Sequence, residues 1–311
     1  MSLMTKEKPY NTLTAYYKNK YNAKVAKIAL NAGFTCPNKD GKKGYGGCTY
    51  CSKLGSGDFA GNKEKSLKEQ FNDIRAVMEK KWPNILYIPY LQANSNTYAP
   101  LNKLKEIYEE VISIIPEKTV AISIATRPDC LEDDVVEYLG KLNNKIPVQI
   151  ELGLQTSNEK TANKINRCST NEEFISAVKR LRRHNIEIVA HIINGLPYET
   201  KEDMLNTISF INNLDIQGIK IHSLLVLKDT KLHEEYKNEG FKILTLEEYV
   251  DITAEQIRML KPSIIIHRLQ ADGVYNDLVE PKWSLKKLVV MNEIDKTLRK
   301  NKYFQGQKYK D

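Results

Sequence analysis

The feature that most constrains the fold of this chain is the alternation of short β-branched runs with segments of helical periodicity. The predicted strands are residues 24–31, 84–91, 119–125, 147–152, 186–193 and 216–222. The first helical segment begins with a Ser66-x-x-Glu69 capping box, after which apolar residues recur every three or four positions. Strand–helix pairs of roughly thirty residues predict a parallel sheet with helical crossovers. We therefore expect an α/β protein that forms a partial (β/α)6 TIM-like barrel.

Three parts are predicted along the 311 residues: an N-terminal extension at 1–23, the barrel at 24–270 and a basic C-terminal helical extension at 271–311. Within the last part, residues 283–300 have the periodicity of an amphipathic helix. We expect this helix to dock on the barrel through its apolar residues, which are Leu285, Leu288, Val289, Ile294 and Leu298.

Each predicted strand ends in a polar stretch of unusual composition. The first strand leads into a cysteine-rich loop, and the other five lead into QANSNTYA, TRPDC, ELGLQT, HIINGLPYET and HSLLVLKDT. The returns from helix to strand are short and plain by comparison. Because α/β barrels build their active sites at the carboxyl ends of the strands, the sequence predicts an active site at this rim.

Three of the five cysteines, Cys36, Cys48 and Cys51, lie in the first of these loops. Thiolates are soft ligands that select zinc, copper(I) or iron–sulfur clusters. A structural zinc site requires four ligands, and the chain has no second C-x-x-C pair. An iron–sulfur cube held by three cysteines leaves one iron open to another ligand. We interpret the loop as a cluster site, with zinc or unligated cysteines as the alternatives.

With its long first gap and the pair Cys48-Thr49-Tyr50-Cys51, the loop resembles that of the radical S-adenosylmethionine (SAM) enzymes. The resemblance spans residues 20–270 and is closest to the Elongator catalytic subunit and to stand-alone bacterial proteins of the YhcC/YtqA type. It implies two cofactors, a [4Fe–4S] cluster and SAM. It also implies reductive cleavage of SAM to a 5′-deoxyadenosyl radical that abstracts hydrogen from a substrate.

The same resemblance implies residues that contact SAM. Gln155 and Arg167, twelve residues apart, match a polar pair that reaches the ribose and the carboxylate in related enzymes, and Glu151 matches with them. Tyr50 is the aromatic residue between the last two cysteines. Gln92 lies where many relatives carry Gly-Gly-Glu for the methionine amino group, and its neighbours Asn94 and Ser95 are further candidates.

At three positions the sequence departs from the family pattern. Ala125 stands where some relatives carry a ribose-binding acid, so we expect Glu151 to take over that contact. Cys168 stands where relatives often have glycine, and we do not expect it to bind the cluster. Cys130 has two interpretations, a buried structural thiol or a reactive group near the substrate.

The net charge of +8 is concentrated at the two ends of the chain. Residues 1–60 hold ten lysines and three acidic residues, and residues 281–311 hold nine basic and three acidic residues. These ends are either solvated surface or a polyanion-binding face formed where the termini meet. No apolar run approaches ~20 residues, and an odd number of cysteines argues against disulfides. We therefore expect a cytoplasmic protein that has no contact with membranes.

The resemblance and the basic ends together predict a tRNA-modifying enzyme that acts on the C5 side chain of the wobble uridine. Two alternatives remain. One is a radical SAM enzyme for a small metabolite or a tetrapyrrole, and the other is a non-catalytic, metal-stabilised RNA-binding protein. A radical SAM enzyme also needs an electron donor, for which we expect flavodoxin or ferredoxin.

Overall fold

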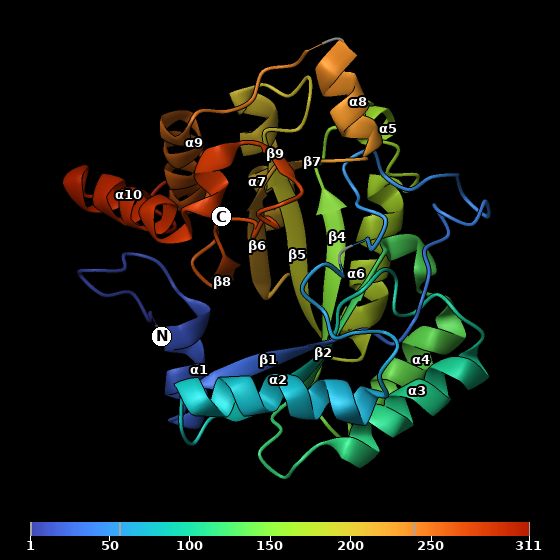
Figure 1. Ribbon diagram of the computed structural model, residues 1–311. Helices are drawn as coiled ribbons and strands as arrows, with labels where there is room; N and C mark the ends of the chain where they lie inside the picture. The colour runs from blue at the N-terminus through green and yellow to red at the C-terminus, as the bar shows by residue number, and fades with distance from the viewer. Residues whose placement is uncertain (1, 56, 239, 311) are drawn as a thin grey trace.

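The computed structural model describes residues 2–55, 57–238 and 240–310 and has a seven-stranded parallel sheet in the order β1-β2-β3-β4-β5-β6-β8. The strand direction turns across the sheet, which curls into a half-barrel with β1 and β8 at its edges (Figure 1). The predicted α/β partial barrel is therefore confirmed. The strands are β1 Val25–Leu30, β2 Leu86–Leu91, β3 Ile122–Thr126, β4 Val148–Gln155, β5 Glu187–Asn194, β6 Gly218–Ser223 and β8 Ile265–Arg268.

All six predicted strands are present, and β8 is a seventh that the sequence pattern did not predict. It pairs in parallel with β6 through Gly218 opposite Ile265 and Ile219 opposite Ile266. Gly218 is needed there, because a Cβ atom at this position would lie 2.6 Å from Nε2 of His267. The extra strand adds Arg268 and the loop that follows it to the carboxyl-end rim.

The crossover helices cover the convex face of the sheet (Figure 1). The predicted capping box at Ser66 and Glu69 forms at the start of α2, and Thr170, Thr200 and Thr245 open later helices in the same way. No helix among the described residues is both long and apolar enough to cross a membrane. The helices are α2 Leu67–Lys81, α3 Leu101–Ile114, α4 Asp133–Asn143, α6 Asn171–Arg183, α7 Lys201–Asn212 and α9 Leu246–Met259.

Helix α1 (Leu13–Tyr21) covers the amino-terminal end of the barrel. Tyr17 packs against Ile88 and Ala121, and the hydroxyl of Tyr16 donates to Glu187, the first residue of β5, at 3.4 Å. Access to the concave face is therefore from the carboxyl end of the strands. Short elements lie beyond those carboxyl ends, namely η1 Pro128–Cys130, α5 Glu159–Lys164, β7 Val226–Leu227, α8 Lys231–Asn238 and β9 Leu278–Glu280.

The two ends of the chain meet beside α10 (Lys287–Lys300), which follows the short helix η2 (Lys282–Leu285) (Figure 1). Asp295 on α10 accepts hydrogen bonds from the hydroxyl of Tyr10, at 2.9 Å, and from Lys8. The backbone N–H of Asn11 donates to Oε1 of Gln305 at 2.9 Å. The two ends therefore meet, as the second interpretation of the basic ends requires, and the polyanion-binding face stays a prediction. The division into extensions and barrel also stays a prediction.

Helix α10 docks through a face that includes two of the predicted residues, Ile294 and Leu298, but not Leu288 or Val289. Val290, Ile294 and Leu298 are buried, and they recur every four residues. Leu288 and Val289, expected on the docking face, are 77% and 43% exposed. The predicted helix started at residue 283, but η2 ends at Leu285 and changes the phase before α10 begins. The apolar residues near residue 288 therefore turn outward.

Candidate active site

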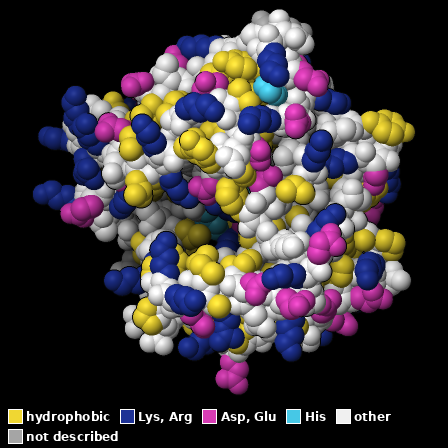
Figure 2. Space-filling view, viewed as in Figure 1, with side chains coloured by type: hydrophobic (Ala, Val, Ile, Leu, Met, Phe, Trp, Pro, Cys, Tyr) yellow, Lys and Arg dark blue, Asp and Glu magenta, His cyan; other side chains and the backbone are white. Residues whose placement is uncertain are grey.

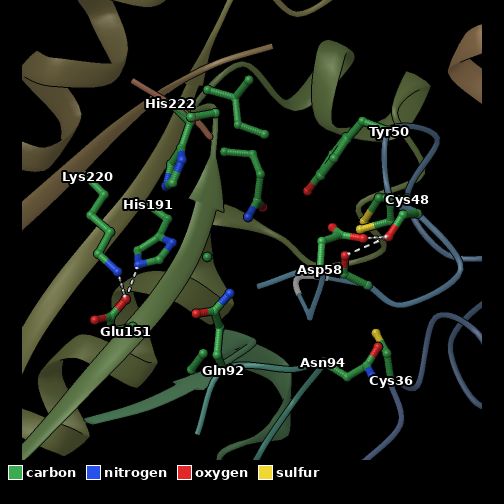
Figure 3. Close-up of a pocket in the computed structure, with 18 of the residues that line it drawn as sticks. Cys36, Cys48, Tyr50, Asp58, Gln92, Asn94, Glu151, His191, Lys220 and His222 are labelled. Carbon is green, nitrogen blue, oxygen red and sulfur yellow. Dashed lines mark hydrogen bonds and ion pairs between the residues drawn. The ribbon is translucent and has the colours of Figure 1, made fainter. Parts of the chain in front are cut away.

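A cavity of about 320 Å³ opens at the carboxyl end of the barrel, where the predicted rim lies. Residues from the loop after β1, from the ends of β2 to β6 and from the loop after β8 line it. The structure brings seven of the eight predicted site residues together around this cavity (Figure 3): Cys36, Cys48, Tyr50, Cys51, Gln92, Glu151 and Gln155. The eighth, Arg167, does not line it.

Hydrogen bonds from the far side of the rim fix the cysteine loop in place. Asn38 is fully buried, and its side-chain amide donates to the backbone carbonyl of Asn166 and lies 3.6 Å from Sγ of Cys48. The backbone N–H of Thr49 donates to the carbonyl of Ile165 at 3.0 Å. Since Ile165 and Asn166 follow α5, the rim after β4 positions the thiols.

The thiols of Cys48 and Cys51 shift each other's pKa in opposite directions. A hydrogen bond from Cys51 lowers the pKa of Cys48 to about 6 although burial opposes this, and the charge of Arg127 adds to the effect. The same hydrogen bond, together with burial, raises the pKa of Cys51 well above its usual value. The thiolate is the form of cysteine that binds metals. The environment of Cys48 therefore stabilises a ligand before any metal is bound.

Glu151 lies on the cavity wall, where Lys220 and His191 approach one of its carboxylate oxygens (Figure 3) and Lys27 and Ser123 the other. Oε1 accepts from Lys27 and from Ser123, the latter at 3.1 Å. Oε2 accepts from Lys220 and lies 2.7 Å from Nε2 of His191. Burial alone would raise the pKa of Glu151, but Lys220 and Lys27 outweigh it and hold the pKa well below its usual range. Its predicted contact with the SAM ribose stays a prediction.

Burial lowers the pKa of three basic side chains near Glu151, those of Lys220, His191 and His222. Burial lowers the pKa of Lys220 to about 7 even though Glu151 attracts its charge. Burial likewise lowers the pKa of His191 to about 4 and that of His222 far below its usual value. Lys220 lines the cavity, so its Nζ can hold or release a proton there near neutral pH.

Gln155 ends β4 in an unusual backbone conformation that directs its amide into the cavity. Its φ is +64°, and the pairing of β4 with β5 shifts register between Gly153 and Gln155. A Cβ atom on residue 153 would lie 2.5 Å from Nε2 of Gln155, so only glycine leaves room for this amide. The sequence Gly-Leu-Gln thus builds a local bulge that serves the site.

Arg167 is 2% exposed, and its guanidinium donates hydrogen bonds to other groups of the protein. Nη1 donates to the carbonyls of Leu154 and Thr156 at 2.9 and 2.7 Å, and Nε donates to the carbonyl of Ser169 at 2.7 Å. Nη2 pairs with Glu159 at 3.2 Å. In this arrangement Arg167 fastens the loop after β4 from behind the cavity. Its predicted contact with the SAM carboxylate stays a prediction.

The loop after β2 contributes Gln92, Asn94 and Ser95 to the cavity, as the sequence suggested for the methionine amino group. The side-chain amide of Asn94 donates to the carbonyl of Phe34 at 3.0 Å, and its Oδ1 accepts from Lys39 at 3.2 Å. These contacts join the loop after β2 to the cysteine loop, so the two loops form one wall.

Sequence reasoning did not assign a role to Lys27, Lys220, Arg127 or Arg268, although a signal existed for the two lysines. Each lysine interrupts an apolar strand run, KVAKIALN or IQGIKIH, where a charge needs a buried partner. Arg127 lines the cavity and makes two hydrogen bonds to Asp129, at 2.9 and 3.0 Å. No strand pattern predicted Arg268, because β8 itself was not predicted.

Neither of the remaining cysteines lines the cavity. Cys130 is 4% exposed, and burial raises its pKa to about 12. Burial also raises the pKa of Cys168, whose Sγ lies 3.1 Å from Oδ1 of Asn166. A protonated, buried Cys130 agrees with the structural interpretation of this thiol. The position of Cys168 agrees with its expected absence from the cluster site.

Comparison of the sequence with known protein families identifies the family of this chain. The family model "Radical SAM superfamily" matches residues 36–211, and the model "Radical_SAM C-terminal domain" matches residues 216–300. The chain belongs to the radical SAM superfamily. Protein YtqA of Bacillus subtilis is 44% identical over 96% of this chain and 92% of its own length. YhcC of Escherichia coli is 30% identical over 96% of this chain and 95% of its own length.

Elongator complex protein 3 is a more distant relative. The Dictyostelium discoideum protein is 29% identical over 50% of this chain and 28% of its own length. The solved structure of Methanocaldococcus infernus Elp3 superposes with a TM-score of 0.69 at 17% identity, over 91% of this chain and 64% of that chain. This chain is therefore a radical SAM enzyme of the stand-alone, Elongator-like kind, with the cofactors of its superfamily, a [4Fe–4S] cluster and SAM.

The residues present fit these cofactors. Cys36, Cys48 and Cys51 would hold the cluster, because they are the cysteines that line the cavity and Cys48 favours the thiolate form. Among the described residues, no three Cys, His, Asp or Glu side chains converge as for a single metal ion. A cube does not require such convergence, since each thiolate binds a different iron. When bound, the cluster supplies the electron that cleaves SAM.

Proposed function

We propose that this radical SAM enzyme modifies the C5 side chain of the wobble uridine in tRNA. The observation that supports an RNA substrate most directly is the position of α10 relative to the cavity. Asp272 lines the cavity, and Lys287, the first residue of α10, pairs with it at 2.7 Å. A helix rich in lysine and arginine thus begins at the cavity mouth and runs to the edge of the molecule (Figures 1 and 2).

The choice of the wobble uridine rests on the likeness of the rim motifs to those of the Elongator catalytic subunit. The chain matches Elongator complex protein 3 over half its length, and ELGLQT and TRPDC lie at the cavity in this structure. A wobble base is accessible because anticodon loops are single-stranded and can turn bases outward. The cavity opens at the carboxyl-end rim of the half-barrel, which suits a base that enters from outside.

Different side chains of the cavity would bind such a base, hold the cluster and transfer a proton. Gln92 and Gln155 offer amides to ribose or base edges, and Cys36, Cys48 and Cys51 hold the cluster. Lys220 can donate or accept a proton at Nζ, because its pKa lies near 7 and Glu151 holds it against the cavity wall. We also propose flavodoxin or ferredoxin as the electron donor and a cytoplasmic location.

The test of this function compares RNA from cells with and without the gene. Mass analysis and sequencing should show a changed wobble-uridine side chain in the cells that lack it, and the purified, cluster-loaded protein should retain tRNA. Identical modification profiles together with no retained tRNA would favour a small metabolite or a tetrapyrrole instead. Zinc without iron or sulfide in anaerobically prepared protein would favour the non-catalytic RNA-binding alternative.

A further inference from the structure

The exposed hydrophobic side chains of this protein are concentrated around the cavity mouth. Nine large hydrophobic side chains are exposed among the residues that the structure describes. Five of them lie in loops that follow the carboxyl ends of strands, namely Tyr45, Leu54, Phe59, Tyr198 and Tyr275. Exposed hydrophobic side chains that are scattered singly need no explanation, whereas a group of them on one surface marks an interaction site. Their clustering on one rim indicates a binding surface.

One aromatic residue of this group, Phe59, lines the cavity, and two more, Tyr45 and Tyr275, belong to loops that contribute other lining residues. Phe59, 53% exposed, lines the cavity itself. Tyr275, 79% exposed, belongs to the loop after β8, whose Asp272 also lines the cavity. Tyr45, 76% exposed, lies two residues before Gly47, another lining residue. Because the three rings come from opposite edges of the half-barrel, from the loops after β1 and β8, they flank anything that enters between them.

Lysines lie among these aromatic residues. The Nζ of Lys231 lies 3.4 Å from the carbonyl oxygen of Tyr45, and Lys53 is exposed in the same loop as Phe59. On the neighbouring rim, the Nζ of Lys164 lies 3.6 Å from the ring centre of Tyr198. Figure 2 shows hydrophobic and basic side chains side by side around the central hollow. Alternating rings and positive charges match the bases and phosphates of a single-stranded nucleic acid.

We propose that Tyr45, Phe59 and Tyr275 form an aromatic collar on which unpaired bases of the RNA substrate stack while the target nucleotide occupies the cavity. This proposal rests on the proposed function for the kind of substrate, and adds the surface that receives it. Stacking on aromatic rings tolerates any base, so the collar holds the loop without reading its sequence. The lysines between the rings contact the backbone, and the two contributions differ in their response to salt.

The experiment measures binding of a fluorescent anticodon stem–loop with uridine at the wobble position to the anaerobic, cluster-loaded protein. A fully paired duplex of the same stem serves as the second probe. The variants are Tyr45→Ala, Phe59→Ala and Tyr275→Ala. The matched control is Phe304→Ala, since Phe304 is 46% exposed but follows α10 and lies outside the loops that supply the collar. All four side chains are largely exposed, so each variant should keep the stability of the wild type.

We expect the wild type to prefer the stem–loop over the duplex and each collar variant to bind the stem–loop roughly tenfold more weakly. The slope of log affinity against log salt concentration should not change in these variants. Tyr45→Trp keeps an aromatic ring at position 45, so it should bind the stem–loop as tightly as the wild type. If the wild type binds the stem–loop and all three alanine variants bind it equally well, the collar is overturned and the mouth serves a protein partner. If the wild type binds neither the stem–loop nor the duplex, both the collar and the proposed RNA substrate are overturned.

Discussion

Nε2 of His191 lies 2.7 Å from Oε2 of Glu151, the same oxygen that accepts a hydrogen bond from Lys220 (Figure 3). One buried carboxylate thus organises three neighbouring strands, because Glu151 lies on β4, His191 on β5 and Lys220 on β6. Lys27 on β1 reaches the other oxygen across the barrel. Glu151 is therefore the anion that these three basic side chains share, and its loss should affect the whole site.

The first prediction concerns this centre. Glu151→Gln removes the charge that balances Lys27 and Lys220, so two buried cations face each other without an anion. We expect the free energy of unfolding to fall by roughly 3–5 kcal/mol, as for other broken buried pairs. Denaturant titration measures it. Glu64→Gln, in a pair with Lys63 that is exposed on both sides, should change it by less than ~0.5 kcal/mol. Equal effects of the two substitutions would contradict this view of Glu151.

The second prediction is a loss of stability between pH 7.5 and 5.5. The folded pKa values of His191, His222 and His267 are lowered below the unfolded value near 6.5, so stability present above pH 6.5 is lost as the pH falls. Each histidine contributes ~1 kcal/mol at pH 5.5, and Lys220 acts in the same direction. Burial raises the pKa of Glu199 to about 7, which stabilises the fold as the pH falls. The net loss should be ~2–3 kcal/mol.

Two variants test the origin of this pH dependence in denaturant titrations at both pH values. Glu199→Gln removes the opposing carboxyl, so the loss between pH 7.5 and 5.5 should become larger. His267→Gln removes one buried histidine, so the loss should become smaller. A wild-type stability that stays constant over this range, with both variants unchanged, would show that these groups titrate as they do in the unfolded chain.

The third prediction concerns the cluster ligands. Alanine at Cys36, Cys48 or Cys51 should abolish the [4Fe–4S] cluster, because three thiolates are the minimum that holds a cube with one open iron. Cys130→Ala and Cys168→Ala are the matched controls and should keep about four irons per chain. Iron and sulfide analysis of anaerobically reconstituted protein, with the absorbance of the thiolate–iron bonds, measures both. Retention of the cluster in a Cys36 variant would reassign the ligands.

The sequence predicted the parallel sheet and the cavity residues because both depend on local patterns. Strand ends in a parallel sheet must share one edge, so polar loops after successive strands had to meet. The strand β8 escaped prediction because its four residues, Ile265–Arg268, are too short to show a period. The hydrogen bonds of Arg167 also escaped prediction, because its carbonyl partners, Leu154 and Thr156, lie thirteen and eleven residues away. Only the folded loop after β4 brings them together.

The fourth prediction separates two roles for Arg167. Arg167→Ala leaves the buried carbonyls of Leu154, Thr156 and Ser169 without their donor, so the free energy of unfolding should fall by roughly 2–4 kcal/mol. If Arg167 also reaches the SAM carboxylate, SAM binding should weaken by roughly 1.5–3 kcal/mol. Calorimetry on folded, cluster-loaded protein measures the second effect.

Arg75→Ala, at a surface pair with Glu79, is the control for Arg167 and should alter stability by less than ~1 kcal/mol and SAM binding not at all. A loss of stability in Arg167→Ala with unchanged SAM affinity would show that Arg167 only fastens the loop after β4. The predicted contact with the cofactor would then be wrong.

The last prediction concerns the basic helix that begins at the cavity mouth. If α10 follows the phosphate backbone, tRNA affinity should fall with salt by a log–log slope of about −0.7 for each single-stranded phosphate neutralised. Replacing Lys286, Lys287 and Lys300 by Gln should flatten this slope by up to about 2 units. Replacing Lys80 on α2, Lys103 on α3 and Lys118 in the turn before β3, none of which lines the cavity, should leave it unchanged. Because the aromatic collar makes no phosphate contact, its variants should keep the wild-type slope, so the two surfaces can be distinguished in one titration series. A slope that neither set of lysine substitutions changes would remove α10 from the RNA path and leave the collar as the remaining RNA contact.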